Sequence, residues 1–117
     1  MDNTKTTETR LQENVDSIAA ELTRLVGNYS GDGDYTEEGQ EAWFDYWSDI
    51  LDISYLVTRD KSYKAVKVLV AFGGPNIWID TESGYIEGYW WVDRARAELP
   101  RNVIEAIDNY FEESWTC

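Results

Sequence analysis

The sequence contains no histidine, and this absence removes several kinds of chemistry at once. Serine and cysteine nucleophiles usually need a histidine base, and histidine is also the commonest general acid–base residue. Zinc sites need cysteine or histidine ligands, and the only cysteine is Cys117, the last residue. A carboxylate hydrolase would need two carboxylates about 5 to 9.5 Å apart in one cleft, and the sequence marks out no such pair. We therefore expect a protein that is not an enzyme and that needs neither a metal nor a cofactor.

Long apolar runs are also missing. No segment approaches the roughly 20 apolar residues that cross a bilayer, and the first ten residues lack the apolar part of a signal peptide. A single terminal cysteine allows no internal disulfide. The length of 117 residues and the 43% hydrophobic content predict one globular domain, residues 1–117, with residues 1–7 disordered. We expect it in the cytoplasm.

Positive charge is scarce, with 10 Lys and Arg against 23 Asp and Glu, a formal net charge of −13. Direct binding to nucleic acid or to an anionic membrane requires basic surface, so neither is expected. The negative charge either favours basic partners or only keeps the protein soluble.

Apolar periodicity predicts the order helix, helix, four strands, helix. Apolar residues three and four positions apart indicate helices over about 7–26 and 36–52, and Pro100 can open a third. Alternating residues indicate strands over about 53–58, 63–72, 76–81 and 85–92, while 93–100 leaves the sheet. We expect an α+β domain: a four-stranded antiparallel meander with two N-terminal helices and one C-terminal helix packed mainly on one face.

The segment DGDYTEEGQEAWFDYWSDILD, residues 32–52, carries eight carboxylates and five aromatic rings but no Lys or Arg. On a helix its acids recur at steps of three and four and form what we call the acidic ridge: Glu37, Glu38, Glu41, Asp45, Asp49 and Asp52. Each helical turn rises about 5.4 Å, similar to the spacing of phosphates along a nucleic-acid strand. The ridge is therefore a candidate binding site for a basic protein groove.

Two other interpretations of this segment stay open. The ridge could be only the solvated face of a helix whose other face buries Trp43 and Trp47. Alternatively, four residues match positions one, three, five and twelve of a calcium loop, but Tyr35 stands where that loop needs glycine. Those four residues are Ser30, Asp32, Asp34 and Glu41.

The strands carry a second candidate surface, the aromatic patch of Trp78, Tyr89 and Trp91. Trp78 is predicted on the face opposite Ile77, and Tyr89 and Trp91 are predicted to share a face. If helices cover only one side of the sheet, these rings form an exposed partner or homodimer site. The alternative is a second buried layer. The Gly-Gly-Pro at 73–75 lacks the pattern of a phosphate-binding loop and indicates a hinge between strands.

The basic residues concentrate on the predicted sheet and its exit loop, away from the acidic segments. This separation could let an acidic helix of one copy meet a basic strand of another, or it could simply offset charge within one fold. The residues concerned are Arg59, Lys61, Lys64, Lys67, Arg94, Arg96 and Arg101.

The stretches GGPNIWIDTESGYIEGYWWVDRARAELP and AIDNYFEESW resemble small uncharacterised proteins of gut bacteria and their mobile elements. The resemblance covers about residues 40–115 and implies no catalytic residues. In size, acidity and lack of catalytic side chains the chain is also similar to anti-CRISPR and antirestriction proteins of phages and plasmids, several of which mimic DNA. These resemblances imply an inhibitor acting in a bacterial host cell.

Two functional hypotheses follow. In the first, the acidic ridge occludes the DNA or RNA site of a basic defence protein, with a CRISPR nuclease as first guess and a restriction enzyme as second. In the second, the aromatic patch makes a dimerising or scaffolding module.

Overall fold

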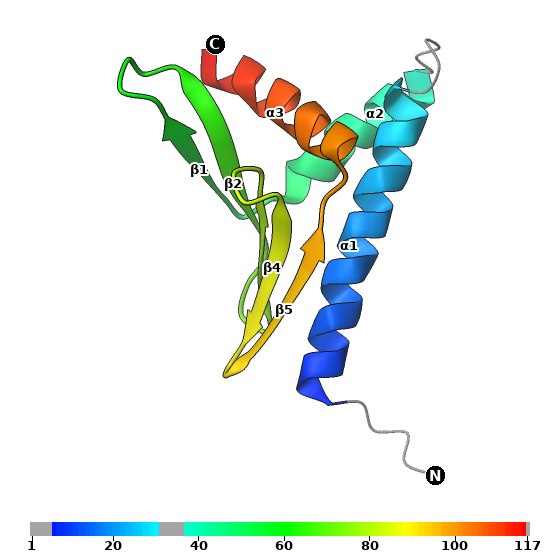
Figure 1. The fold of residues 1–117 in the computed structure, drawn as a ribbon. Coiled ribbons are helices and arrows are strands. Elements are labelled where there is room, and N and C mark those ends of the chain that lie inside the picture. Colours follow the sequence, from blue (N-terminus) through cyan, green and yellow to red (C-terminus); the bar gives the residue numbers. More distant parts are fainter. Residues whose placement is uncertain (1–5, 31–36, 117) are drawn as a thin grey trace.

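The computed structural model describes residues 6–30 and 37–116 (Figure 1). Within these residues it has three α-helices, one short 3₁₀ helix and a five-stranded antiparallel sheet. In chain order the elements are α1 (Thr7–Ser30), α2 (Glu37–Tyr46), η1 (Trp47–Asp49), β1 (Asp52–Val57), β2 (Tyr63–Ala71), β3 (Asn76–Asp80), β4 (Tyr85–Trp90), β5 (Asp93–Glu98) and α3 (Arg101–Thr116). The predicted α+β class and the meander are confirmed, but the predicted number of four strands is wrong.

The additional strand is β5, in the segment that the sequence predicts to leave the sheet. It pairs with β4 from Trp90 opposite Asp93 to Tyr85 opposite Glu98. Its two residues on the helix side are Ala95 and Ala97, both buried. Alanine gives only a weak apolar alternation, so the strand is hard to detect, but its small side chain lets α1 lie close against β5.

The sheet follows the chain, in the order β1-β2-β3-β4-β5. Alternation along β2, β3 and β4 buries Val66, Val68, Ile77, Ile79 and Ile86 on one face. Gly84, in the β3–β4 turn, has a φ of +81°, a conformation that glycine adopts without a steric penalty.

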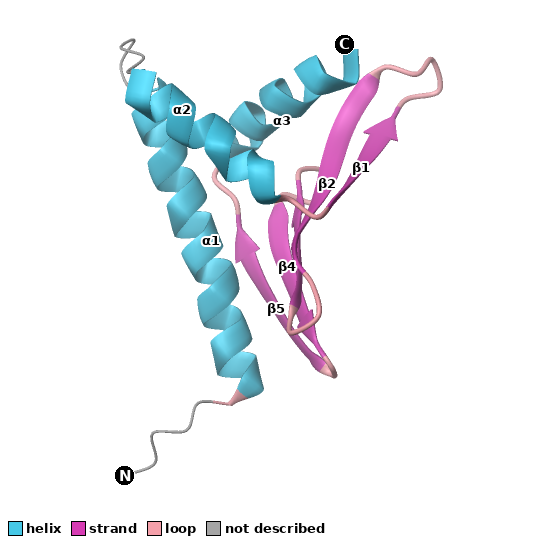
Figure 2. Ribbon diagram, turned by 180° about the vertical axis from the view of Figure 1, so that it is seen from behind, coloured by secondary structure: helices cyan, strands magenta, loops and turns pink. Residues whose placement is uncertain are grey.

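All three helices lie on this buried side of the sheet (Figures 1 and 2), so the predicted one-sided packing is confirmed. α1 packs along β4 and β5, and α3 packs against β2 and α1. The predicted stripe of α3 supplies Val103, Ile107 and Phe111 to the core. None of the helices in the described residues lies on the other face of the sheet.

α1 begins one residue after Thr6, whose Oγ1 accepts a hydrogen bond from the main-chain nitrogen of Thr9 at 3.1 Å. This is an N-cap. The disorder predicted for residues 1–7 stays a prediction, and residues 1–5 lie outside the described residues. The helix also continues to Ser30 rather than ending at Val26. A glycine such as Gly27 weakens a helix by only about 1 kcal/mol relative to alanine, so it need not end one.

α2 is shorter than predicted. It ends at Tyr46, and Ile50 is already extended, with φ −68° and ψ 148°. The Oγ of Ser48 donates to the main-chain oxygen of Asp45 at 2.7 Å and so satisfies one carbonyl at the end of the helix. The main-chain nitrogen of Leu51 then bonds to Leu69 of β2 at 2.9 Å, which starts the sheet.

In the described part of the chain, no helix is both long enough and apolar enough to cross a membrane.

Candidate functional site

The acidic ridge spans three elements rather than one helix face. Four of its residues lie on α2, while Asp49 lies on η1 and Asp52 begins β1. The α-helical spacing of four therefore holds only for Glu37, Glu41 and Asp45. The prediction of one continuous ridge to residue 52 is wrong, because η1 and β1 follow different periods.

The side chains of the acidic ridge nevertheless all face solvent, since each of the six residues is exposed. Within the part of the chain that the structure describes, no Lys or Arg forms an ion pair with them. Asp52 accepts a hydrogen bond from the main-chain nitrogen of Ile53 at 2.9 Å, which leaves its charge in place. The ridge thus presents six carboxylates without cations beside them.

Two tryptophans hold α2 and η1 in this orientation. Trp43 is 1% exposed and Trp47 is 3% exposed, as the sequence predicts for the inner face of the segment. Their rings meet edge to face at 5.4 Å, and Trp47 packs in the same way on Phe111 of α3 at 5.1 Å. The indole nitrogen of Trp47 is buried without a hydrogen-bond partner. The ring contacts of Trp43 and Trp47 therefore hold α2 and η1 against α3.

Charge is divided between the two layers of the fold. The helical layer, consisting of α1, α2, η1 and α3, carries 13 Asp and Glu against three Lys and Arg. Residues 52–98, which form the sheet and its turns, carry seven against six. The sheet is close to neutral, so almost all of the excess negative charge of the described residues lies on one side of the molecule.

The described residues contain no group of three or more acidic or cysteine side chains placed to hold a metal ion. The calcium-loop interpretation involves Asp32 and Asp34, which lie outside the described residues.

The aromatic patch is divided by the structure. Trp78 lies on the face opposite Ile77, as predicted; Tyr89 lies on the same open face of the sheet, and both rings are half-buried. Trp91 does not share this face, because it forms the β4–β5 turn with Val92 and is 91% exposed. Its φ is +56°, which is rare for a bulky side chain and is not predicted by strand alternation.

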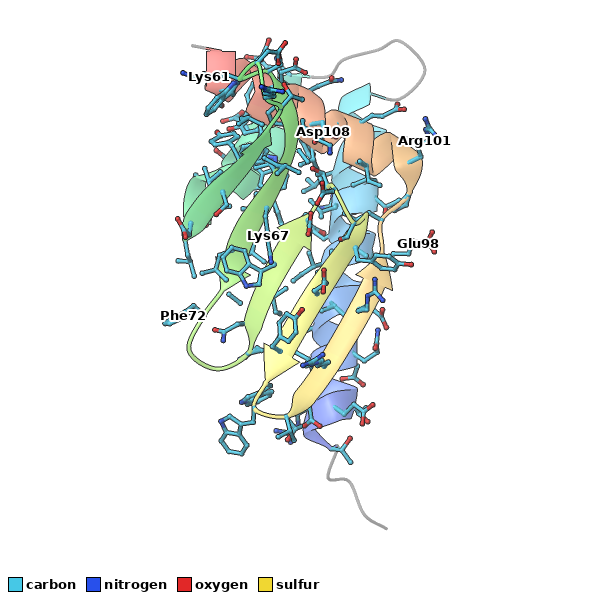
Figure 3. All side chains as sticks on the ribbon, turned by 60° about the vertical axis from the view of Figure 1, so that its left-hand side comes forward. Lys61, Lys67, Phe72, Glu98, Arg101 and Asp108 are labelled. Atoms are coloured by element: carbon cyan, nitrogen blue, oxygen red, sulfur yellow. The ribbon has the colours of Figure 1, made fainter. Side chains whose placement is uncertain are left out.

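Basic side chains cover the rings of the open face (Figure 3). The Nζ of Lys67 lies 5.0 Å from the ring centre of Trp78, and Lys67 points out from β2 on this face. The guanidinium of Arg94 lies over Tyr89 at 5.8 Å. The hydroxyl of Tyr89 also donates to Glu87 at 2.8 Å. These neighbours account for the half-burial of the rings without a second layer of helices.

A feature that the sequence analysis missed is a group of apolar residues at one end of the sheet. β2 and β4 run in the same direction, so the loops that follow them lie at the same end, which is also where β1 begins. Phe72 is labelled there in Figure 3. The four residues at this end and their exposed fractions are Leu51 58%, Phe72 74%, Trp91 91% and Val92 93%.

Comparisons of the chain with protein-family models, with curated proteins and with solved structures find no match.

Proposed function

We propose that the protein is a non-enzymatic inhibitor that binds a basic nucleic-acid-binding protein of a bacterial defence system and occludes its DNA or RNA site. A CRISPR nuclease is the first candidate partner, and a restriction enzyme is the second. The observation that carries the proposal is the division of charge: the helical layer has an excess of ten acids, and the sheet has an excess of one.

This division favours the helical layer over the sheet as the surface for a basic partner. If the charges of the two layers only neutralised each other within one fold, Lys and Arg would form ion pairs with the acidic ridge. Among the described residues, none of its six carboxylates forms such an ion pair. The sheet has no net positive charge, so it is also a poor acceptor for the ridge of a second copy. A foreign basic groove is the better complement.

Occlusion would use the arginines and lysines that normally hold phosphates. Glu37, Glu41 and Asp45 stand one helical turn apart, about 5.4 Å of rise each, which approximates successive phosphates. Asp49 and Asp52 would extend the negative surface toward the sheet without this regular spacing. Because Trp43 and Trp47 are buried, α2 would meet the partner as a preformed element and lose little entropy on binding.

The proposal is tested by charge reversal of Glu41, Asp45 and Asp49 to lysine together. The assay is cleavage of target DNA by a guide-loaded CRISPR nuclease, and by a restriction endonuclease, with increasing amounts of the protein. We expect the wild type to inhibit, the variant to lose inhibition while keeping its circular dichroism spectrum, and wild-type binding to weaken as salt is added.

A matched control makes the same change of charge on the other layer. Reversal of Glu82, Asp93 and Glu98 to lysine raises the net charge by six, from −13 to −7, as the first variant does. We expect this control to inhibit like the wild type. If the ridge variant inhibits fully, or if both variants fail equally, the acidic ridge is not the binding site.

The second candidate function is a dimerising or scaffolding module that uses the open face of the sheet. The observation in its favour is that Trp78 and Tyr89 lie on the face of the sheet that none of the described helices covers. A Trp78→Ala variant would then have a lower mass than the wild type by light scattering at equal concentration. Equal masses would count against this function.

A further inference from the structure

The two edges of the sheet are protected to different degrees. Along β5 lies α1, and the Nε2 of Gln12 donates to the main-chain oxygen of Arg96 at 2.8 Å. β1 is the opposite edge strand, and its hydrogen-bonded neighbour in the sheet is β2 alone. Half of the main-chain groups of an edge strand point away from the sheet, so β1 can still accept another strand.

β1 has only part of the protection that usually prevents such pairing, a shift of its register with β2 between Leu56 and Val57. Its sequence, DISYLV, has no proline, no lysine and a single charged residue, at its first position. Ser54 and Leu56 are exposed on the open face. On the helix side, Tyr55 is held by ring contacts to Trp115 at 5.1 Å and Tyr63 at 6.2 Å. The strand is thus rich in β-branched and aromatic residues, and its edge carries no neighbouring strand, although the main-chain nitrogen of Ile53 already donates to the side chain of Asp52.

The charges at the two ends of β1 indicate which strand fits. Asp49 and Asp52 stand at its start, and Arg59 and Lys61 stand in the turn after its end, where Lys61 is labelled in Figure 3. Asp60, in the same turn, accepts a hydrogen bond from the main-chain nitrogen of Ser62 at 3.3 Å. An antiparallel strand with the same sequence would place acids beside bases at both ends.

We infer that β1 is a self-association edge, at which two copies of the chain join antiparallel through β1 into one ten-stranded sheet. A register centred on Tyr55 sets Ile53 opposite Val57 and Asp52 opposite Thr58 of the second copy, where Arg59 is the next residue along the chain. Directly opposite residues then share a face, as antiparallel pairing requires. A twofold axis perpendicular to the sheet would place both helical layers on the same side.

The inference does not depend on the proposed function, and salt separates the two. Two copies of charge −13 repel each other, and salt screens this repulsion while leaving main-chain hydrogen bonds intact. Exposed pairs between the opposite charges near the two ends of β1 fix the register more than the affinity. Self-association should therefore strengthen with salt, whereas binding to a basic partner should weaken.

The experiment is sedimentation equilibrium of the purified chain over increasing concentration, at low and high salt. We expect the mass to rise from 13.6 kDa toward twice that value, and to rise further in high salt. Ser54→Lys places a charge on the edge and should raise the dissociation constant about tenfold or more, the effect of losing one or two main-chain hydrogen bonds. The matched control Ser17→Lys makes the same substitution on an exposed position of α1 and should associate like the wild type.

Three results would overturn the inference. The first is a wild type that stays at 13.6 kDa at every concentration and salt level. The second is a Ser54→Lys variant that associates as well as the Ser17→Lys control. The third is a dimer that Trp78→Ala dissociates and Ser54→Lys does not, which would assign association to the open face instead of the edge.

Discussion

α1 packs directly on Gly88 of β4, and adding one methyl group there should force the helix and the sheet apart. A Cβ at this position would lie 2.8 Å from Cδ1 of Leu11, 3.0 Å from Cγ1 of Val15 and 3.2 Å from Cγ of Leu11. Carbon atoms pack best at roughly 3.5–4.0 Å, so the methyl group would overlap two side chains. Both side chains are 0% exposed and cannot turn toward solvent.

The size of the effect follows from two opposing terms. Overpacking of a filled core costs about 1–3 kcal/mol of unfolding free energy. Alanine also lowers the conformational entropy of the unfolded chain, which raises the free energy of unfolding by about 0.4–1 kcal/mol where the native backbone conformation allows alanine. Gly88 does not have a positive φ, so this stabilising term applies to it. We expect Gly88→Ala to lower the free energy of unfolding by about 1–2 kcal/mol, measured by urea denaturation followed through tryptophan fluorescence.

Gly74→Ala is the matched control, because a Cβ at Gly74 would meet nothing within 4 Å and its φ is not positive. It should leave stability unchanged or slightly higher. A double-mutant cycle with Leu11→Ala adds a second check, since the new methyl group would fill part of the space that Leu11 vacates. The two costs should then couple by at least about 0.5 kcal/mol. Additive costs, or a Gly88→Ala variant as stable as Gly74→Ala, would refute this close packing of α1.

Two further predictions concern the β4–β5 turn and the half-buried Tyr46. Trp91 is exposed and has a positive φ, so Trp91→Gly should raise the free energy of unfolding by about 0.5–1 kcal/mol in urea denaturation; a decrease would mean that the ring packs on the fold. Burial, together with the nearby charge of Glu21, raises the pKa of Tyr46 to about 12. Since the folded chain retains this proton longer than the unfolded chain, the stabilisation is complete below pH 10 and is lost as pH rises to about 12, at up to about 1.4 kcal/mol per pH unit. Urea midpoints measured across this range should fall more steeply in wild type than in Tyr46→Phe, and equal slopes would contradict the prediction.

The sequence predicts those elements whose buried residues are large. Val66, Val68 and Ile79 give clear alternation, and the helical stripe of α3 is equally clear, so these elements are placed correctly. The strand β5 is missed because Ala95 and Ala97 leave almost no apolar signal. Their size is determined by the approach of α1, which is a tertiary contact that no local pattern records.

The sequence predicts that the acidic ridge is exposed, but it does not predict that the ridge is divided among α2, η1 and β1. Trp43 and Trp47 are four residues apart, and burial of both suits a continuing α-helix as well as a turn into η1. The hydrogen bond of Ser48 to Asp45 and the pairing of Leu51 with β2 decide between these possibilities. The position of Trp91 is mispredicted for a similar reason. The alternating pattern in the sequence continues through Trp91, whereas the turn there is set by the pairing of β4 with β5.

The exposed carboxylates of α2 are not needed for its folding, and this can be measured. Buried tryptophans hold the helix, while Glu37, Glu41 and Asp45 repel one another at spacings of four residues. Glu41→Lys would remove two repulsions and add two attractions, and these four terms of about 0.2–0.5 kcal/mol each should stabilise the chain by about 0.8–2 kcal/mol. If the variant were less stable in urea than the wild type, the carboxylate of Glu41 would have a structural role and the argument from charge would fail. A gain in stability would show that the chain retains an unfavourable charge pattern that its fold does not require, and such a pattern is expected on a surface that binds cations of a partner.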